Sequence, residues 1–213
     1  MPKKNQTDAL IKQLSGEWTP VEPIAHPLRR FCPWLVFSII YVVAIVYFIG
    51  LRPDMGSKMY DSIFIFEMIL VFTTGLFSAV SAAYMCVPDM RGAKWLKHVS
   101  FTLIGVFFVW TLTMWGGQGF AMPDQLWAHC VPKGVMIAFL PVAALIYMAK
   151  GGSTTQPVLM GTLSIASVAA LAYMGLRTTC MSDELGYIFF FHVLPFLVIG
   201  TVLGAVARKI FRW

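Results

Sequence analysis

Six long apolar runs constrain the fold more than any other feature of this sequence. They cover residues 31–51, 62–87, 99–120, 134–149, 156–176 and 185–207. A helix needs about 20 apolar residues to cross the hydrocarbon core of a bilayer. The sequence therefore predicts an all-α integral membrane protein with six transmembrane helices. The fourth run is the weakest, because it is short and contains Pro141, although Val131 and Pro132 could extend it upstream.

The composition supports this prediction. Of the 213 residues, 58% are hydrophobic and only 12% are charged, whereas soluble domains carry about a quarter charged residues. This composition excludes a soluble globular domain, a coiled coil, collagen and a disordered chain. Little of the chain remains for a soluble catalytic domain.

The positions of Lys and Arg predict the orientation. If the N-terminus is cytoplasmic, the external loops contain only Arg52, Lys58, Lys133 and Arg177 of the 16 basic residues, and the cytoplasmic segments contain the other twelve. Cytoplasmic loops of membrane proteins carry an excess of Lys and Arg. We therefore expect both termini in the cytoplasm of a bacterial inner-membrane, multi-pass protein. The net charge of +6 then reflects basic loops rather than direct nucleic-acid binding.

Three parts follow from this topology. Residues 1–30 form a polar cytoplasmic segment, residues 31–207 the six-helix transmembrane domain, and residues 208–213 a basic cytoplasmic tail.

The N-terminal segment contains one expected short amphipathic helix, over residues 7–14. Thr7 is its expected N-cap, and Leu10, Ile11 and Leu14 form one apolar stripe. A lone helix of this length is marginal in water. We expect it to pack against a partner or lie on the membrane.

The predicted topology sorts the four cysteines into two pairs. Cys32 and Cys86 lie at the cytoplasmic ends of the first two spans, where small apolar packing residues are expected. Cys130 and Cys180 lie in external loops, which face an oxidising compartment in a bacterial inner membrane. Two thiols on this face indicate a structural disulfide, a reversible redox pair or a shared metal site.

Other metal-binding side chains lie close to the external cysteines in the sequence. Asp124 and His129 precede Cys130, and Asp183 follows Cys180. Thiolates, imidazole and carboxylates together bind soft or borderline divalent metals. The spacing matches no closed zinc motif, so the sequence predicts no cofactor and no certain metal, with these three residues as auxiliary ligands.

One carboxyl lies inside a predicted span. Glu67 follows the start of the second run by a few residues, and His192 lies at a comparable depth in the sixth. Ionisable groups in a bilayer need a partner or a neutral form. We therefore expect a hydrogen bond between Glu67 and His192.

Small residues recur at four-residue spacing in two runs. Gly75, Ala79 and Ala83 share one stripe of the second run, and Gly200 and Gly204 share one of the sixth. Such stripes let helices approach closely. Packing inside a monomer is favoured over a dimer face, and the oligomeric state stays open.

Short motifs run along the whole chain in a recognisable order. They are TDALI at 7–11, WTPV at 18–21, GLRPDM at 50–55, Glu67, Cys130, CMSD at 180–183, HVLP at 192–195 and RKIFRW at 208–213. In order and spacing they resemble the NrsF family, the negative regulators of sigma F, which are six-span inner-membrane anti-sigma factors.

The resemblance implies a regulatory, non-enzymatic protein that holds an extracytoplasmic-function sigma factor inactive at the membrane. It further implies that Cys130 and Cys180 sense oxidative or heavy-metal stress. The expected partners are the sigma factor and the lipid bilayer. The expected sigma-factor contacts are Leu10, Ile11, Leu14, Arg91, Lys94 and Lys97.

Two other functions use the same residues. A membrane thiol oxidoreductase would use Cys130 and Cys180, but such enzymes typically carry a Cys-x-x-Cys pair, which this sequence lacks. A small proton-coupled transporter would use Glu67 and His192, but the chain shows no internal repeat.

The charge distribution predicts the location of the C-terminus. A reporter that is active only in the periplasm, fused after Trp213, is expected to give no signal, because twelve of the 16 basic residues fall on the same side as this end. Activity of that fusion, measured beside a matched cytoplasmic reporter, checks the prediction. A strong periplasmic signal would mean that the fourth run does not cross the membrane.

Overall fold

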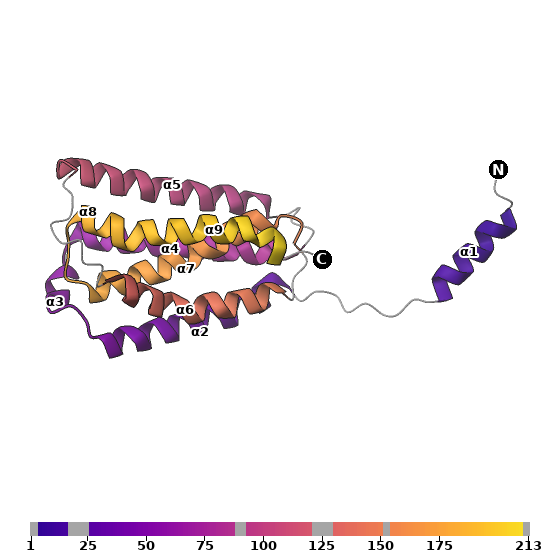
Figure 1. Ribbon diagram of the computed structural model, residues 1–213, viewed down its shortest axis with the longest axis horizontal. Coiled ribbons are helices and arrows are strands. Elements are labelled where there is room, and N and C mark those ends of the chain that lie inside the picture. The colour runs from indigo at the N-terminus through magenta and orange to yellow at the C-terminus, as the bar shows by residue number, and fades with distance from the viewer. Residues whose placement is uncertain (1–3, 17–25, 88–92, 121–129, 151–153, 211–213) are drawn as a thin grey trace.

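The computed structural model describes residues 4–16, 26–87, 93–120, 130–150 and 154–210 of the chain, and the secondary structure in these segments is entirely helical (Figure 1). Six of the helices, with α8, η1 and α9 counted as one continuous helix, form a bundle. The elements are α1 (Lys4–Gly16), α2 (Pro27–Ile49), α3 (Met55–Lys58), α4 (Ser62–Met85), α5 (Lys94–Gly117), α6 (Cys130–Lys150), α7 (Pro157–Thr179), α8 (Leu185–Ile188), the π-helical turn η1 (Phe189–Val193) and α9 (Leu194–Ile210).

The six bundle helices are long and apolar enough to cross a membrane, which confirms the predicted fold class. Three of them begin earlier than the apolar runs, at Pro27, Lys94 and Cys130. Pro27 suits a first helical turn because its fixed φ is helical and its missing N–H would have no partner there. The fourth helix reaches spanning length because it starts at Cys130 rather than at residue 134.

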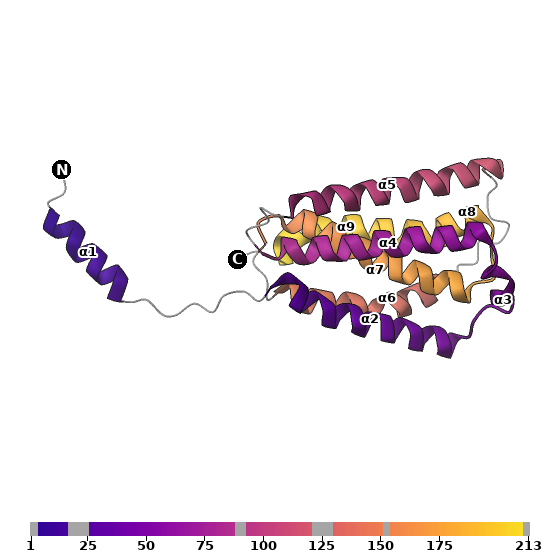
Figure 2. The ribbon, with the colours of Figure 1, turned by 180° about the vertical axis from the view of Figure 1, so that it is seen from behind.

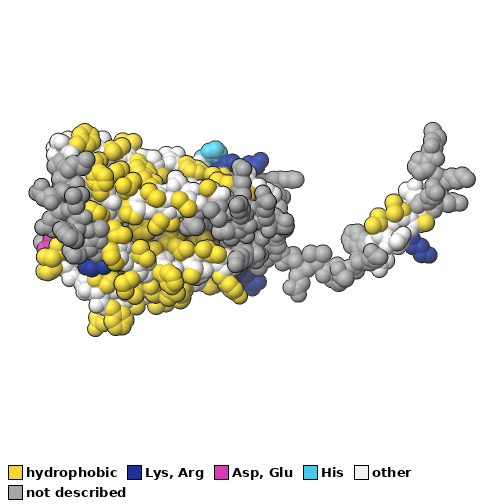
Figure 3. All heavy atoms as spheres, viewed as in Figure 1, with side chains coloured by type: hydrophobic (Ala, Val, Ile, Leu, Met, Phe, Trp, Pro, Cys, Tyr) yellow, Lys and Arg dark blue, Asp and Glu magenta, His cyan; other side chains and the backbone are white. Residues whose placement is uncertain are grey.

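The outer face of the bundle is apolar. Figure 3 shows hydrophobic side chains over its middle, and Tyr47 and Phe48 on α2 are more than 80% exposed. A soluble protein rarely exposes apolar patches of this kind. Hydrocarbon tails of lipids would cover this face.

Two antiparallel helices, α4 and α7, form the centre of the bundle and contain most of its buried residues. Gly75 on α4 faces α7 so closely that an added Cβ atom would lie 2.7 Å from the Ala170 Cβ. Gly75 and Ala79 are both buried. The small-residue stripe of α4 therefore serves packing inside the bundle.

Around this centre, α2 and α6 pack against each other. The Trp34 indole N–H donates to the Pro141 carbonyl at 3.0 Å, and the Tyr41 hydroxyl donates to the Met136 carbonyl at 2.7 Å. Helix α5 contacts α4 and α8 and is the least buried of the six (Figure 2).

The bundle has two distinct ends (Figure 1). The first, here called the disulfide end, contains α3, α8 and the starts of α4 and α6. The second, the terminal end, contains the starts of α2, α5 and α7 and the end of α9. Helix α1 lies apart from the bundle, beyond the terminal end.

Helix α1 begins earlier than predicted. It starts at Lys4, so Thr7 lies inside the helix and is not its N-cap. Leu10, Ile11 and Leu14 are each more than half exposed. The predicted apolar stripe is therefore present, and its side chains are exposed.

The π-helical turn η1 interrupts the last helix directly before Pro195. Proline has no N–H, so the Phe191 carbonyl cannot accept the usual i→i−4 bond from residue 195. Upstream, the Leu194 N–H bonds the Phe189 carbonyl, five residues back. The wide turn accommodates the proline and contains His192.

Candidate functional site

The disulfide end of the bundle is closed by a bond between Cys130 and Cys180. Cys130 is the first residue of α6, and Cys180 follows the last residue of α7. Both side chains are buried. The bond therefore ties the start of α6 to the end of α7. Cys32 and Cys86 lie at the terminal end.

Of the three expected auxiliary ligands, the structure describes Asp183. Asp124 and His129 lie outside the described residues. Asp183 lies instead in an ion-pair cluster, where Arg52 and Arg177 donate to its carboxylate at 2.8–3.1 Å. Its expected role as a metal ligand beside Cys180 is therefore not supported by its position.

Glu67 pairs with Arg177 and not with His192. The Arg177 Nε and Nη2 atoms lie 2.8 and 3.1 Å from the two carboxylate oxygens, and the Tyr173 hydroxyl donates to Oε1. The prediction of a hydrogen bond between Glu67 and His192 was therefore wrong. Because α4 begins and α7 ends at the disulfide end, Glu67 and Arg177 occur at the same depth.

The second buried guanidinium belongs to Arg52, between α2 and α3. Its side chain is 1% exposed and donates to Asp54 at 2.6 and 2.7 Å and to Asp183 at 2.8 and 3.1 Å. Its backbone N–H bonds the Thr178 carbonyl at 3.0 Å. The hydrogen bonds that Arg52 donates to Asp54, and then those to Asp183, raise the pKa of Arg52, so it stays charged.

Asp183 links the two guanidinium groups, and Lys58 contacts it at 3.0 Å. Partial burial alone would raise the pKa of Asp183, but the hydrogen bonds from Arg52, Lys58 and Arg177 outweigh it and hold the pKa well below its usual value. A carboxyl with a lowered folded pKa contributes stability above its ordinary pKa of about 3.9 and loses it as the pH falls toward the folded value. Asp183 is therefore charged at neutral pH.

His192 lies on η1 and is 1% exposed. Neither ring nitrogen has a hydrogen-bond partner within the described structure. The rings of Tyr173 and Tyr187 face it edge-on at 6.1 and 6.0 Å. A buried polar group without a partner is rare and costs stability.

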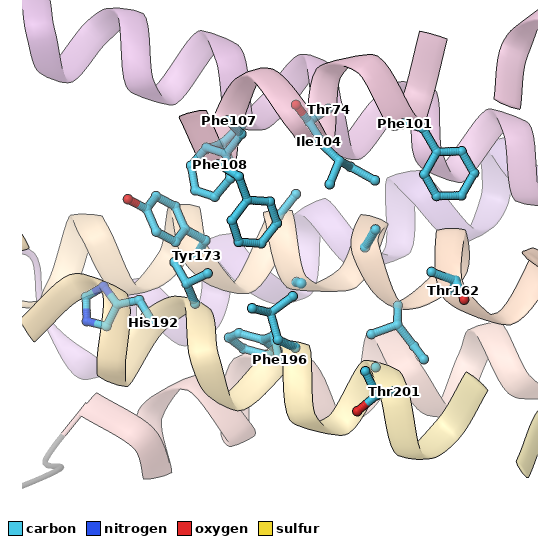
Figure 4. Close-up of a pocket in the computed structure, with 18 of the residues that line it drawn as sticks. Thr74, Phe101, Ile104, Phe107, Phe108, Thr162, Tyr173, His192, Phe196 and Thr201 are labelled. Atoms are coloured by element: carbon cyan, nitrogen blue, oxygen red, sulfur yellow. The ribbon is translucent and has the colours of Figure 1, made fainter. Parts of the chain in front are cut away.

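A cavity of about 420 Å³ lies between α4, α5, α7 and α9, within the usual range for ligand pockets. Figure 4 shows Tyr173 and His192 near one end and Phe101 toward the other. The hydroxyls of Thr74, Thr162 and Thr201 in its lining bond carbonyls of their own helices. His192 is thus the polar lining group, among those described, that lacks a partner.

The expected sigma-factor contacts belong to the opposite end of the molecule. Lys94 is exposed and Lys97 half-buried at the start of α5, and Arg91 lies outside the described residues. The apolar stripe of α1 lies apart from them (Figure 1). The structure does not join these two groups into one surface.

Sequence reasoning missed Arg52, Arg177 and Tyr173. Two signals were available: a carboxyl inside a span requires a partner, and Arg177 is one of only four basic residues on its side of the predicted topology. The antiparallel pairing of α4 and α7, which sets their common depth, was not predicted.

Comparisons with known proteins point to one family. A family model described as "NrsF: Negative regulator of sigma F" matches residues 14–213. Searches of curated proteins and of solved structures gave no significant match.

The buried ion pair predicts coupled effects of substitution. Arg177→Gln or Glu67→Gln is expected to cost about 3–5 kcal/mol, because each leaves a buried charge without its counter-ion. The double variant should lose less than the sum of the two. Unfolding of the purified protein in detergent measures all three free energies.

Lys58→Gln is the matched control. It removes a positive charge from the same cluster but at a more accessible position, so the expected cost is about 1 kcal/mol or less. Strictly additive losses for the two buried positions would contradict the pairing.

Proposed function

The chain belongs to the NrsF family of negative regulators of sigma F, and we propose that it restrains an extracytoplasmic-function sigma factor at a bacterial inner membrane. A change in the Cys130–Cys180 pair, caused by oxidative or heavy-metal stress, releases the sigma factor. The observation that carries the second step is the disulfide itself, which closes one end of the bundle. The function is regulatory and not enzymatic.

In this proposal, the disulfide end faces the periplasm and the terminal end faces the cytoplasm. Two observations support the assignment. Twelve of the 16 basic residues fall on the terminal side. Disulfides persist in the oxidising periplasm, whereas cytosolic thiols are kept reduced.

The alternative functions gain no support from the described residues. The transporter hypothesis relied on a bond between Glu67 and His192, but Glu67 bonds Tyr173 and Arg177 instead. The oxidoreductase hypothesis needs a thiol pair open to a protein substrate, whereas Cys130 and Cys180 are 6% and 3% exposed.

Helix α5 provides a physical connection between the two ends. Near the disulfide, the Trp115 ring stacks on Phe189 of η1 at 5.2 Å, and the Leu185 N–H donates to Gln118 Oε1 at 3.2 Å. At the terminal end, α5 begins with Lys94. The repressing state has the reduced pair. An oxidant removes two electrons and two protons to form the disulfide, or a metal ion binds the two thiolates, and either change ties the residue after α7 to the start of α6. The segment that carries α8 and η1 then shifts, and α5 carries the change to the cytoplasmic face.

The exposed stripe of α1 predicts the main sigma-factor contact. Replacing Leu10 and Leu14 together by Asp is expected to release the sigma factor while the protein stays in the membrane, because a buried apolar contact is lost. Co-purification of the sigma factor with the membrane protein is the measurement.

The control places two Asp residues on the other face of the same helix, as Ala9→Asp with Gly16→Asp, at two exposed positions. It adds the same charge but should leave sigma-factor binding unchanged. If the stripe variant still co-purifies the sigma factor, the contact lies elsewhere, on the segment from Arg91 to Lys97.

The cysteine pair is expected to act as one unit. Cys130→Ser and Cys180→Ser should each have nearly the effect of the double variant, because the bond is lost with the first partner. The expected phenotype is a regulator locked in the repressing state at ordinary membrane abundance. A reporter of sigma-factor activity, with and without oxidant or metal, measures it.

Two other outcomes have distinct meanings. Loss of the variants from the membrane would show a structural disulfide, worth about 4 kcal/mol for a 50-residue loop in the chain-entropy model. A normal response in each single variant would refute sensing by this pair.

A further inference from the structure

Three metal-binding side chains meet at the disulfide end. A ring nitrogen of His192 and the Sγ atoms of Cys130 and Cys180 all lie within 4.8 Å of one another, and all three residues are buried. They come from different elements: η1, the start of α6 and the residue after α7.

We infer that the reduced form of this protein binds one soft or borderline divalent metal ion through Cys130 Sγ, Cys180 Sγ and a ring nitrogen of His192. A thiol or phosphine reductant opens the disulfide with two electrons and two protons and gives two thiols. Binding of the ion then releases those two protons, and each sulfur forms a bond to the metal as a thiolate.

The unpartnered imidazole is the first observation that supports this site. Both ring nitrogens of His192 lack a hydrogen-bond partner, although the residue is 1% exposed. Nearly all buried polar groups have one. A metal ion would give one nitrogen the partner that the disulfide form does not.

The π-helical turn is the second observation. Turns of this type are rare and occur frequently at functional sites. Here the turn contains His192, and without it the side chains that follow would be rotated around the helix. Figure 4 shows the imidazole beside Tyr173. The Tyr173 hydroxyl donates its hydrogen bond to Glu67 and not to His192.

The spacing of the donor atoms fits after a small movement. Bonds of about 2.3 Å to sulfur and 2.0–2.1 Å to nitrogen place donors on one tetrahedral ion about 3.5–3.8 Å apart. The three donor atoms all lie within 4.8 Å of one another. Breaking the S–S bond lets the sulfurs separate, and α6 is then no longer tied to the end of α7.

Charge favours a divalent ion. Two thiolates and a neutral imidazole carry a charge of −2, so a divalent ion makes the site neutral, which reduces the cost of burial. Among the described residues, the group of metal-binding side chains at this site contains these two cysteines and His192 and no carboxylate. The ligand set is therefore S₂N, which suits Zn²⁺ or Cd²⁺ and not Mg²⁺ or Ca²⁺.

This inference rests on the proposed function only in taking the disulfide to be reversible. If the proposed regulator responds to metal, this inference names the three residues that bind the ion and includes His192 among them.

The test uses the full chain in detergent, with Cys32→Ser and Cys86→Ser as the background so that only the external pair can supply thiolates. A phosphine reductant opens the disulfide, and Cd²⁺ is titrated while the thiolate-to-metal charge-transfer absorption is recorded. We expect one equivalent to bind. Cys130→Ser should abolish the band, and His192→Ala should weaken binding by on the order of 100-fold, since one of three ligands is lost.

Two further variants separate ligation from folding. His98→Ala removes an exposed histidine on α5 at the terminal end and should bind Cd²⁺ like the background. His192→Cys restores a ligand and should recover the affinity with a stronger charge-transfer band. Recovery by cysteine but not by alanine is a result that a purely structural role of His192 would not give.

Two outcomes would overturn the site: absence of the band in the reduced background, or equal affinity of the His192→Ala variant. Neither bears on sigma-factor binding, which is measured separately by co-purification. Tight Cd²⁺ binding without release of the sigma factor would leave the metal site standing and reject the proposed trigger.

Discussion

The buried pair of Glu67 and Arg177 is the interaction on which the rest of the disulfide end depends. A carboxylate and a guanidinium inside a span are tolerated only when each neutralises the other and their hydrogen bonds are complete. Glu67 accepts from Arg177 and Tyr173, and Arg177 reaches onward to Asp183. This requirement fixes the register of α4 against α7.

The relative position of α4 and α7 also determines how the loops at this end are held. The Asp183 carboxylate forms ion pairs with Arg52, Lys58 and Arg177. These pairs hold the segment after α2 against the segment after α7. The disulfide adds the start of α6 to the same assembly. One end of the bundle is thus cross-linked by charge and by a covalent bond, and only the covalent bond can be opened by redox chemistry.

The sequence allowed the six spanning helices to be anticipated, because apolar length depends on local composition. It also grouped Cys130 with Cys180, and these two residues form a disulfide. It did not give the partner of Glu67. That choice depends on which helices are neighbours and on their relative depth, which no periodicity in a single sequence encodes. The π-helical turn before Pro195 was missed for a related reason: proline signals a break but not its geometry.

Differences in burial among the six helices explain how a change at the disulfide end reaches the terminal end. Helix α7 is the most buried span and α4 the next, so neither can move without losing core contacts. Helix α5 is the least buried and borders the cavity, where it lacks opposing atoms along part of its length. Regions with few buried contacts rearrange at the lowest free-energy cost. Since Trp115 of α5 stacks on Phe189, three residues before His192, a change at the disulfide reaches the loosely packed helix first.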